Sequence, residues 1–420
     1  MKIAIVGAGF TGLAAGLKLI KAGHQVTIFE KDSLPGGLAA GFKIPEWQWT
    51  IEKYYHHCFT NDNSILNLAK EIEYPVLIKR PETSVYVNDK FYKLDSPFDV
   101  LKFPELNFPE RLRMGIAIAL LKYNPFWKSL EQYRVSDLLL KMMGEKPYEL
   151  LWEPLIVKKF GPFAKDISLA WFWARIVKRT PSLVYPQGGF LEFANAIIAE
   201  IQKKGGEVIF NKEIKKISSQ KNGTVKIDNL IFDKVIVTLP SFLFIQITPQ
   251  LPDTYKQKLL ELKEIGTVNL VLRLKKPFLK DKTYWLNICD LRFPLTAIAE
   301  HTNFMDKKYY NNEHLVYLGN YLPQNHPFMQ MSNEELLKTY DPLLTKINKN
   351  YKSQIIDIYI FTDFFAQPII PVNYSKIIPS FETPLKNVYL ANIQQVYPWD
   401  RGINYAVELG EKIANVIFDR

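Results

Sequence analysis

Residues 2–42 read KIAIVGAGFTGLAAGLKLIKAGHQVTIFEKDSLPGGLAAGF, and this stretch decides the fold class. Ile3 to Val6 predict a short buried strand, and the apolar residues that follow at helical intervals predict a helix. Val26 to Phe29 predict a second buried strand. Between the first strand and the helix stand three glycines in the G-x-G-x-x-G spacing, Gly7, Gly9 and Gly12. The order of strand, glycine loop, helix and strand predicts a dinucleotide-binding βαβ unit.

Each part of this unit has a physical task. Gly7 makes the tight turn, Gly9 lets the backbone approach a pyrophosphate, and Gly12 lets helix and strand pack closely. The start of the helix offers unpaired N–H groups and the positive end of its dipole. Glu30 lies 18 residues after Gly12, where a carboxylate accepts a hydrogen bond from a ribose hydroxyl. An accidental core pattern is the alternative, but the complete order favours a nucleotide site.

The bulk composition is that of an ordinary globular protein. The chain has 420 residues, of which 47% are hydrophobic and 23% charged, enough for two or three cores. Its two cysteines, Cys58 and Cys289, cannot form a disulfide framework, and their spacing fits no metal site, so we expect no metal and a reducing compartment. The apolar run from Met114 to Leu121 is too short to span a bilayer. We therefore expect a cytoplasmic protein, with peripheral contact to the inner face of the membrane left open.

The formal net charge of +10 restricts the partners. No long Lys/Arg block and no nucleic-acid motif accompany it, which argues against binding DNA or RNA. The excess charge suits an anionic substrate or a membrane surface, and a generally basic proteome is an equal alternative. The sequence leaves the oligomeric state open.

Along the chain, α/β patterns alternate with other segments. Residues 1–80 predict α/β structure, and residues 81–95 predict a hairpin that turns at Asn88-Asp89. Residues 97–183 predict helices broken by five prolines, Pro104, Pro109, Pro125, Pro147 and Pro154. Further predictions are a helix at about 190–204, strands near 208–210 and at 234–240, strand-rich residues 265–320, a helix at 333–350, a strand at 388–391 and a last helix at about 403–418.

Scattered α/β segments imply a discontinuous nucleotide-binding domain. We assign residues 1–80, 186–240 and 385–420 to it, and residues 81–185 and 241–384 to a substrate domain with a helical insert at about 97–183. Such interleaving is typical of flavoproteins, whereas nicotinamide dehydrogenases usually keep the Rossmann unit contiguous.

Two more motifs make a resemblance specific. Gly36-Gly37 follows Glu30, and the strand at 388–391 leads into a loop with Gly402 and a helix. With the N-terminal fingerprint and residues 234–240, they resemble the FAD-dependent amine oxidase superfamily over nearly the whole chain. That group includes protoporphyrinogen oxidases, phytoene desaturases and, more distantly, UDP-galactopyranose mutases. The resemblance implies FAD and an α/β fold: a Rossmann-like FAD-binding domain of the glutathione-reductase-2 type, interleaved with an α+β substrate domain.

The resemblance also implies which residues bind FAD. At the pyrophosphate it places Gly7, Gly9, Phe10, Thr11 and Gly12, and at the ribose Glu30 followed by Lys31. Along the ribityl chain it places Gly36, Gly37, Leu38 and Ala39, and beside the adenine Ile214. At the pyrophosphate and the pyrimidine side of the flavin it places Asn392, Arg401, Gly402, Ile403, Asn404 and Tyr405. The family often has Arg where this chain has Leu38.

Three segments on the substrate side resemble mutase motifs, and equally a group known only as protoporphyrinogen-oxidase-like. Residues 52–62, EKYYHHCFTND, resemble a mutase motif, in which His57 corresponds to the histidine that lies over the flavin. Residues 158–161 resemble K-Q-W-G, and Arg175 to Arg179 resembles R-I-x-x-R. We therefore predict that His57, Arg175 and Arg179 face the flavin or contact the substrate. The structural alternatives are a hydrogen-bonded core histidine and solvated helix charges.

Two main functions follow from the resemblance. The first is an FAD-dependent oxidoreductase that oxidises or desaturates a largely apolar, isoprenoid- or porphyrinogen-like substrate by hydride transfer to flavin. The second is a non-redox mutase-like isomerase of a sugar nucleotide, and a flavin-bound scaffold without turnover is a third. Ala297 argues against the mutase, because it stands where mutases have an Arg for the substrate diphosphate. For residues 108–127, core packing and a membrane surface that admits a lipid both remain open.

Overall fold

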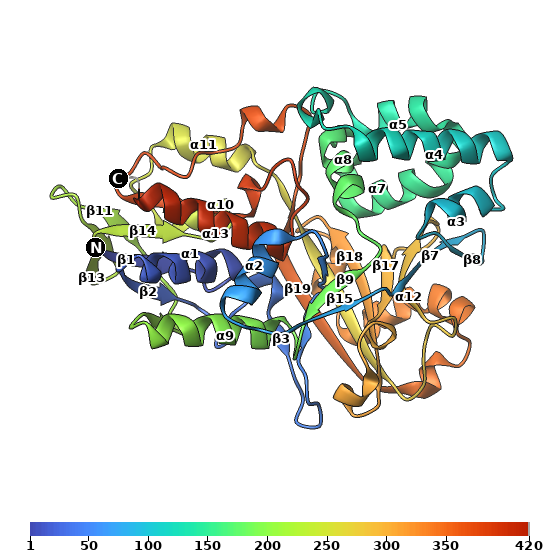
Figure 1. The fold of residues 1–420 in the computed structure, drawn as a ribbon, viewed down its shortest axis with the longest axis horizontal. Coiled ribbons are helices and arrows are strands. Elements are labelled where there is room, and N and C mark those ends of the chain that lie inside the picture. The colour runs from blue at the N-terminus through green and yellow to red at the C-terminus, as the bar shows by residue number, and fades with distance from the viewer. Residues whose placement is uncertain (419–420) are drawn as a thin grey trace.

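A five-stranded parallel sheet forms one end of the molecule (left in Figure 1) in the computed structural model, which describes residues 1–418. Its strands, in spatial order, are β10 (Glu207–Ile209), β2 (Gln25–Phe29), β1 (Lys2–Val6), β14 (Lys234–Val237) and β20 (Val388–Leu390). The predicted Rossmann-like α/β fold is confirmed.

Both faces of this sheet are covered, as the continuous apolar strands require. Ile3 and Ile5 of β1 face a core that includes three helices, α1 (Phe10–Lys21), α9 (Phe190–Lys203) and α13 (Ile403–Phe418). Ala4 and Val6 face a second core. That core includes the small sheet of β11 (Ile217–Ser219), β12 (Val225–Ile227) and β13 (Leu230–Phe232), and helices α10 (Ser241–Ile247) and α11 (Asp253–Glu261).

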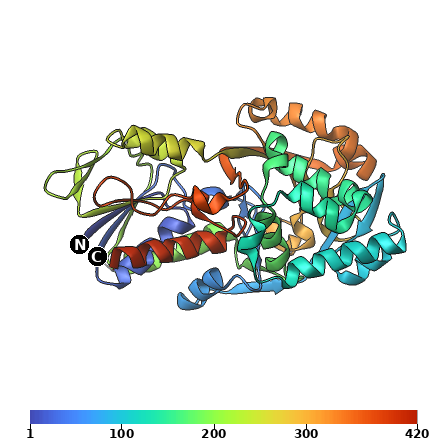
Figure 2. The ribbon, with the colours of Figure 1, turned by 90° about the horizontal axis from the view of Figure 1, so that it is seen from above.

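Helix α13 lies against the start of α1, and a glycine permits the close approach. A Cβ atom at Gly410 would lie 2.3 Å from the carbonyl oxygen of Thr11. Seen from above, α13 runs from the middle of the molecule along the parallel sheet (red in Figure 2). The first and last helices of the chain are therefore neighbours, and both begin at the same side of the sheet.

A seven-stranded mixed sheet forms the other half. Its order is β19 (Ile355–Pro368), β15 (Glu264–Leu274), β18 (His314–Leu322), β17 (Ala297–Glu300), β16 (Thr283–Ile288), β7 (Glu82–Val87) and β8 (Lys90–Lys93). Helix α12 (Asn333–Ile347) covers one face. The hairpin predicted at Asn88-Asp89 is present between β7 and β8. The predicted elements do not include β19, although its Ile, Tyr, Phe and Thr residues favour a strand; strict period-2 alternation is absent.

Short strands connect the two halves. They are β3 (Gly41–Phe42) with β4 (Ile51–Glu52), and β5 (Cys58–Phe59) with β9 (Leu183–Pro186) and β6 (Val76–Lys79). Helix α2 (Asn63–Glu71) follows β5. The strands of the parallel sheet come from three separate stretches of chain, and those of the mixed sheet from the stretches between them; the exact domain division stays a prediction.

The helical insert packs beside the mixed sheet, at the upper right of Figure 1. Its helices are α3 (Pro97–Lys102), α4 (Phe108–Tyr123), α5 (Val135–Met143), α6 (Glu145–Pro147), α7 (Glu153–Phe160) and α8 (Leu169–Lys178). In the described residues, no helix is both long enough and apolar enough to cross a membrane.

The prediction that all five prolines break helices is wrong for Pro147 and Pro154. The chain stays helical from 145 to 160, because a π-helical segment (Tyr148–Trp152) joins α6 to α7. Pro147 lies in the first turn, where the missing N–H group is not needed, and Pro154 follows directly after the π-helical segment, whose wider turn changes the hydrogen-bond pattern at that point. Sequence alone does not reveal this, since a first-turn proline and a helix-ending proline look the same.

Candidate functional site

The loop after β1 is closed tightly around two of its glycines. Gly7 has φ of 110°, and a Cβ atom there would lie 2.4 Å from Oγ1 of Thr238. A Cβ at Gly12 would lie 2.0 Å from the carbonyl oxygen of Gly7. No larger residue fits either position without a shift of the backbone. Helix α1 therefore starts directly against the end of β1.

The second glycine pair packs on the first. The N–H of Gly36 donates to the carbonyl oxygen of Ala8 at 3.0 Å, and Gly9 and Gly36 form a parallel bridge. A Cβ at Gly37 would lie 3.4 Å from the Cα of Gly9. Gly9 also caps α1 without any side-chain bond, so the first N–H groups of the helix have no side-chain cap. Two stretches of bare backbone thus lie side by side at a helix N-terminus.

Glu30 fixes the same loop from the end of β2. Its buried carboxylate accepts from the N–H groups of Ala8 at 2.8 Å and Asp32 at 3.0 Å. A carboxylate has about four acceptor positions, so capacity remains for a ligand hydroxyl. Lys31 is exposed, and Ile214 is buried.

The predicted residues near the C-terminus divide into two groups. The side chain of Asn392 donates to Leu239 and Ser241, which ties the ends of β14 and β20 together. The side chain of Asn404 accepts from the N–H of Ile65 in α2. By contrast, a Cβ atom at Gly402 would meet nothing closer than 3.8 Å. These two asparagine side chains serve the fold, while the backbone before α13 stays open.

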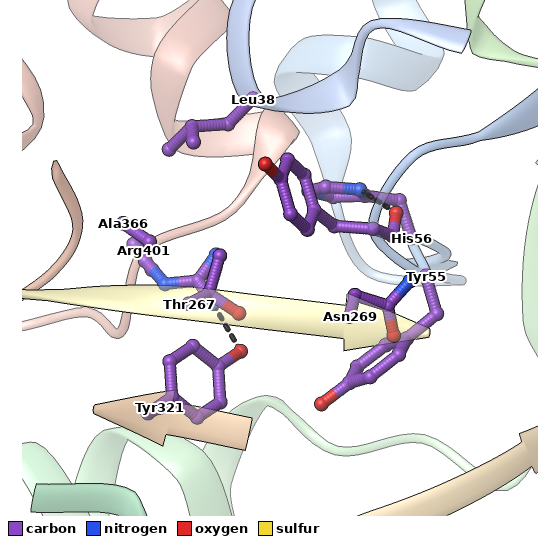
Figure 3. A pocket seen from close by; sticks show the side chains of 9 residues that line it. Leu38, Tyr55, His56, Thr267, Asn269, Tyr321, Ala366 and Arg401 are labelled. Carbon is purple, nitrogen blue, oxygen red and sulfur yellow. Dashed lines mark hydrogen bonds between the residues drawn. The ribbon is translucent and has the colours of Figure 1, made fainter. Parts of the chain in front are cut away.

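A small cavity of about 20 Å³ lies where the two sheets meet (Figure 3). It is lined by Leu38, Tyr54, Tyr55, His56, Thr267, Asn269, Tyr321, Ala366 and Arg401. These residues come from the second glycine loop, the segment between β4 and β5, three strands of the mixed sheet and the loop before α13. Of the predicted cofactor residues, Leu38 and Arg401 reach it.

The histidine in the cavity wall is His56, whereas the resemblance to the mutase motif indicates His57. Its Nδ1 lies 2.6 Å from the carbonyl oxygen of Tyr54, and burial, with the Arg401 charge, lowers its pKa to about 4. His57 is not among the lining residues found in the described chain. Its Nδ1 lies 3.1 Å from the hydroxyl of Tyr284, and burial, with nearby Arg179, lowers its pKa to about 3. The only sequence signal for His56 is the His-His doublet.

Arg175 and Arg179 belong to a group of charges around Asp400, in which Arg175 is half-buried and Arg179 is exposed. The carboxylate of Asp400 accepts from Arg175 at 2.5 Å and from the indole N–H of Trp171 at 2.9 Å, and lies 3.6 Å from Nζ of Lys159. Burial alone raises the pKa of Asp400, but Lys159 and the arginines hold that pKa well below its ordinary value. Asp400 therefore stays ionised.

Positive charge exceeds negative charge in this cluster, which we define as Lys159, Arg175, Arg179, Asp400 and Arg401. Arg401 donates to Gln367 at 2.9 Å and to the hydroxyl of Tyr321. Across residues 1–418, the exposed Arg179 side chain has no hydrogen bond or ion pair. Four cations thus lie around one carboxylate, and Lys159 and Arg175 pair with it directly, so the group carries an excess of positive charge.

Two other positions that resemble mutase motifs, Lys158 and Ala297, contribute no charge to this cluster. Lys158 donates to the carbonyl oxygens of Ile288, Asp290 and Leu295, so Lys159, not Lys158, joins the cluster. Ala297 lies buried inside β17. The position where mutases have an Arg therefore presents no charge.

The glycine loops, the uncapped helix and Glu30 fit a dinucleotide, because bare backbone, N–H donors and a ribose acceptor converge at one place. A family model described as "Flavin containing amine oxidoreductase" matches residues 10–417.

Individual relatives are distant. An uncharacterised protein of Methanocaldococcus jannaschii is 26% identical over 56% of this chain, and a 15-cis-phytoene desaturase of Capsicum annuum is 23% identical over 74%. The alignments span 58% of the length of each of these two curated relatives.

Among solved structures, reduced UDP-galactopyranose mutase superposes with a TM-score of 0.78 at 15% identity, covering 100% of this chain and 94% of that chain. This similarity concerns the fold alone. The family match supports an FAD-dependent oxidoreductase. The chain belongs to the flavin containing amine oxidoreductase family, whose flavin is typically FAD.

Proposed function

We propose that this protein oxidises or desaturates a largely apolar, isoprenoid- or porphyrinogen-like substrate. The observation that supports this most is the match to the flavin containing amine oxidoreductase family. The cavity wall agrees with it in part, because Leu38, Ala366 and the rings of Tyr54, Tyr55 and Tyr321 lie there beside the polar side chains of His56, Thr267, Asn269 and Arg401. When bound, FAD supplies the acceptor for a hydride. The protein itself then has to bind and orient the substrate and exclude water from the site.

For the cofactor, we propose that the residues of the two glycine loops, Glu30 and the backbone before α13 hold FAD. The N–H groups at the start of α1 would face the pyrophosphate, and the bare backbone of Gly9 and Gly37 admits a close approach. Leu38, which lies in both the second glycine loop and the cavity wall, would then separate cofactor from substrate.

On the substrate side, the cavity wall carries the charge of Arg401, while Tyr54, Tyr55 and His56 are neutral at pH 7. Burial raises the pKa of both Tyr54 and Tyr55 well above the ordinary value, so both phenols remain protonated. His56, with its pKa of about 4, is neutral. None of these three groups is poised to exchange a proton near pH 7, which suits a reaction that needs no general acid or base.

The first experiment is an absorbance spectrum of the purified protein, followed by anaerobic addition of phytoene or protoporphyrinogen. We expect flavin bands, and bleaching of those bands by a substrate of this class. A protein that is folded but carries no flavin would contradict both the proposed cofactor and the proposed reaction. Flavin bands that no apolar substrate bleaches would contradict the substrate class only.

One observation favours a second function, a mutase-like isomerase of a sugar nucleotide. The unpaired Arg179 and the excess of cations around Asp400 suit an anionic substrate. Ala297 counts against it, because no Arg stands at that position. The test is turnover of UDP-galactofuranose after reduction with dithionite. Turnover only in the reduced protein, lost in Arg179→Gln and retained in Arg179→Lys, would select the mutase.

A further inference from the structure

The outer side of α4 is apolar and uncovered. Phe108, Leu112, Ile116, Leu120 and Tyr123 are spaced so that they share one face of the helix. Their exposed fractions run from 45% at Leu112 to 84% at Tyr123. A surface helix normally turns such a stripe inward, so this one is without its partner.

Neighbouring residues enlarge the stripe. Phe98 and Leu101 of α3, and Phe126 just after α4, are exposed as well. We call these eight residues the α4 face: Phe98, Leu101, Phe108, Leu112, Ile116, Leu120, Tyr123 and Phe126. Helix α4 lies at the outside of the helical insert, at the opposite end of the molecule from β13 (Figure 1).

The basic residues of α4 do not interrupt this face. Lys122 donates to the carbonyl oxygens of Ile176, Val177 and Arg179, each at 2.9 Å. Likewise, Arg111 donates to backbone oxygens of residues 101 and 106, and Arg113 to those of residues 141 and 142. Their charges are held beside the face, on backbone carbonyls.

In segment 97–134, which carries the α4 face, the exposed charges have one sign. The acidic residues of segment 97–134 are all buried or half-buried, and each accepts a hydrogen bond: Asp99, Glu105, Glu110 and Glu131. The charged residues that remain exposed in this segment are all positive: Lys102, Arg113, Lys128 and Arg134. Arg134 lies 3.9 Å from the exposed carboxylate of Asp166, and the next exposed acid along the chain is Asp137 of α5, so Lys102, Arg113 and Lys128 form the positive border. An apolar stripe with a positive border complements an anionic lipid surface, and the net charge of +10 reinforces the attraction.

We propose that the α4 face docks the protein on an anionic lipid bilayer, with α4 lying in the interface. The exposed positive charges of Lys102, Arg113 and Lys128 beside the face favour an anionic lipid surface over a second, equally basic copy of this chain. The proposal stands on the surface alone, whatever the substrate is. It also places the bilayer one helix from the charged cluster, because Lys122 binds the end of α8, which carries Arg175.

The test is flotation of the flavin-loaded protein with lipid vesicles. One set of vesicles is phosphatidylcholine alone, and the other contains a third phosphatidylglycerol. We expect the protein to float with the anionic vesicles at low salt and less so at high salt. Failure to bind anionic vesicles at low salt would overturn the proposal.

A matched pair of variants locates the surface. Ile116→Ser with Leu120→Ser removes two side chains of the α4 face that are 51% and 61% exposed. Leu230→Ser with Ile231→Ser removes two from β13 that are 47% and 51% exposed. We expect affinity for vesicles to fall about tenfold or more in the first variant and to stay unchanged in the second. Equal losses in both would refute the α4 face.

Three controls distinguish an anionic lipid surface from a neutral one and from a second copy of the chain, and test for misfolding. The ratio of flavin absorbance to protein should match the native value in both variants, because neither pair touches the glycine loops. Lys102→Gln with Lys128→Gln should weaken binding to anionic vesicles and leave the weak binding to neutral ones unchanged. A native dimer that dissociates in Ile116→Ser with Leu120→Ser would show instead that the face joins two copies.

Discussion

Helices α1 and α4 have similar apolar sequences and opposite surroundings. Nine of the 12 residues of α1 are buried, whereas α4 buries three of 16, Met114, Ala117 and Leu121. The parallel sheet, α9 and α13 enclose α1, while α4 rests on α5 and α8 along one side only. An apolar sequence therefore favours burial of a helix, and the neighbouring elements decide whether the helix is in fact buried. Four substitutions test this contrast.

The largest effect is expected at Gly12 in α1. In Gly12→Ala the new Cβ would lie 2.0 Å from the carbonyl oxygen of Gly7 and force α1 from β1. We expect the free energy of unfolding to fall by about 3 kcal/mol or more, with loss of bound flavin. Urea denaturation and the flavin-to-protein absorbance ratio measure both. Native stability with native flavin content would show that the loop is loosely packed.

The next effect concerns Glu52, whose carboxylate accepts from the N–H of Phe190 at the start of α9. Burial raises its pKa from 4.5 to about 7, so the folded protein holds a proton that the unfolded chain releases. Its contribution to stability is then highest below pH 4.5 and declines as the pH rises to 7. The whole decline amounts to about 3 kcal/mol.

Denaturation of the native protein and Glu52→Gln from pH 4 to pH 8 isolates this contribution. Gln keeps the shape and the acceptor for Phe190 but does not titrate. We expect the difference in stability between the two proteins to grow in favour of the variant as the pH rises, and to level off above pH 7. A difference independent of pH would mean that Glu52 titrates alike in both states.

A smaller effect is expected at the junction of α4 with α8. Lys122→Met keeps most of the aliphatic stem but removes the donor to three carbonyl oxygens at the end of α8. We expect a loss of about 2 kcal/mol in the free energy of unfolding, with flavin content unchanged. A matched loss of flavin would show that the insert and the glycine loops are coupled, and would weaken the contrast between the two helices.

The smallest effect, of opposite sign, is expected at Gly115 in α4. A Cβ atom there meets nothing within 4 Å. Gly115→Ala should therefore raise the free energy of unfolding by about 0.5–1 kcal/mol, because the unfolded chain loses freedom and no contact is strained. Thermal denaturation beside Gly12→Ala gives the comparison directly. Destabilisation by Gly115→Ala would show that α4 is covered in solution.

Several features could be predicted from local sequence because they depend on nearby residues. The loop of Gly7 to Gly12 and the hairpin at Asn88-Asp89 are of this kind, since steric limits on φ and ψ act within a few residues. Strand β19 is not among the predicted elements although its residues favour a strand, and its place at the edge of the mixed sheet beside β15 depends on distant segments.

The candidate site was predictable only in part. Arg175 and Arg179 were singled out, but their grouping with Lys159 and Asp400 joins segments more than 200 residues apart. The choice between His56 and His57 depended on which ring the chain turns toward the cavity, and no spacing rule contains that information.

The sequence by itself determined the parallel sheet with its glycine loop, the family and the positive charge of the chain. Only the tertiary structure decided that Lys159 and Arg175 share the carboxylate of Asp400, that His56 lines the cavity, and that α4 leaves its apolar face uncovered. The physical reason is the distance along the chain over which each kind of interaction acts. Backbone sterics and periodic patterns act over a few residues, whereas burial and charge balance depend on which distant segments become neighbours when the chain folds.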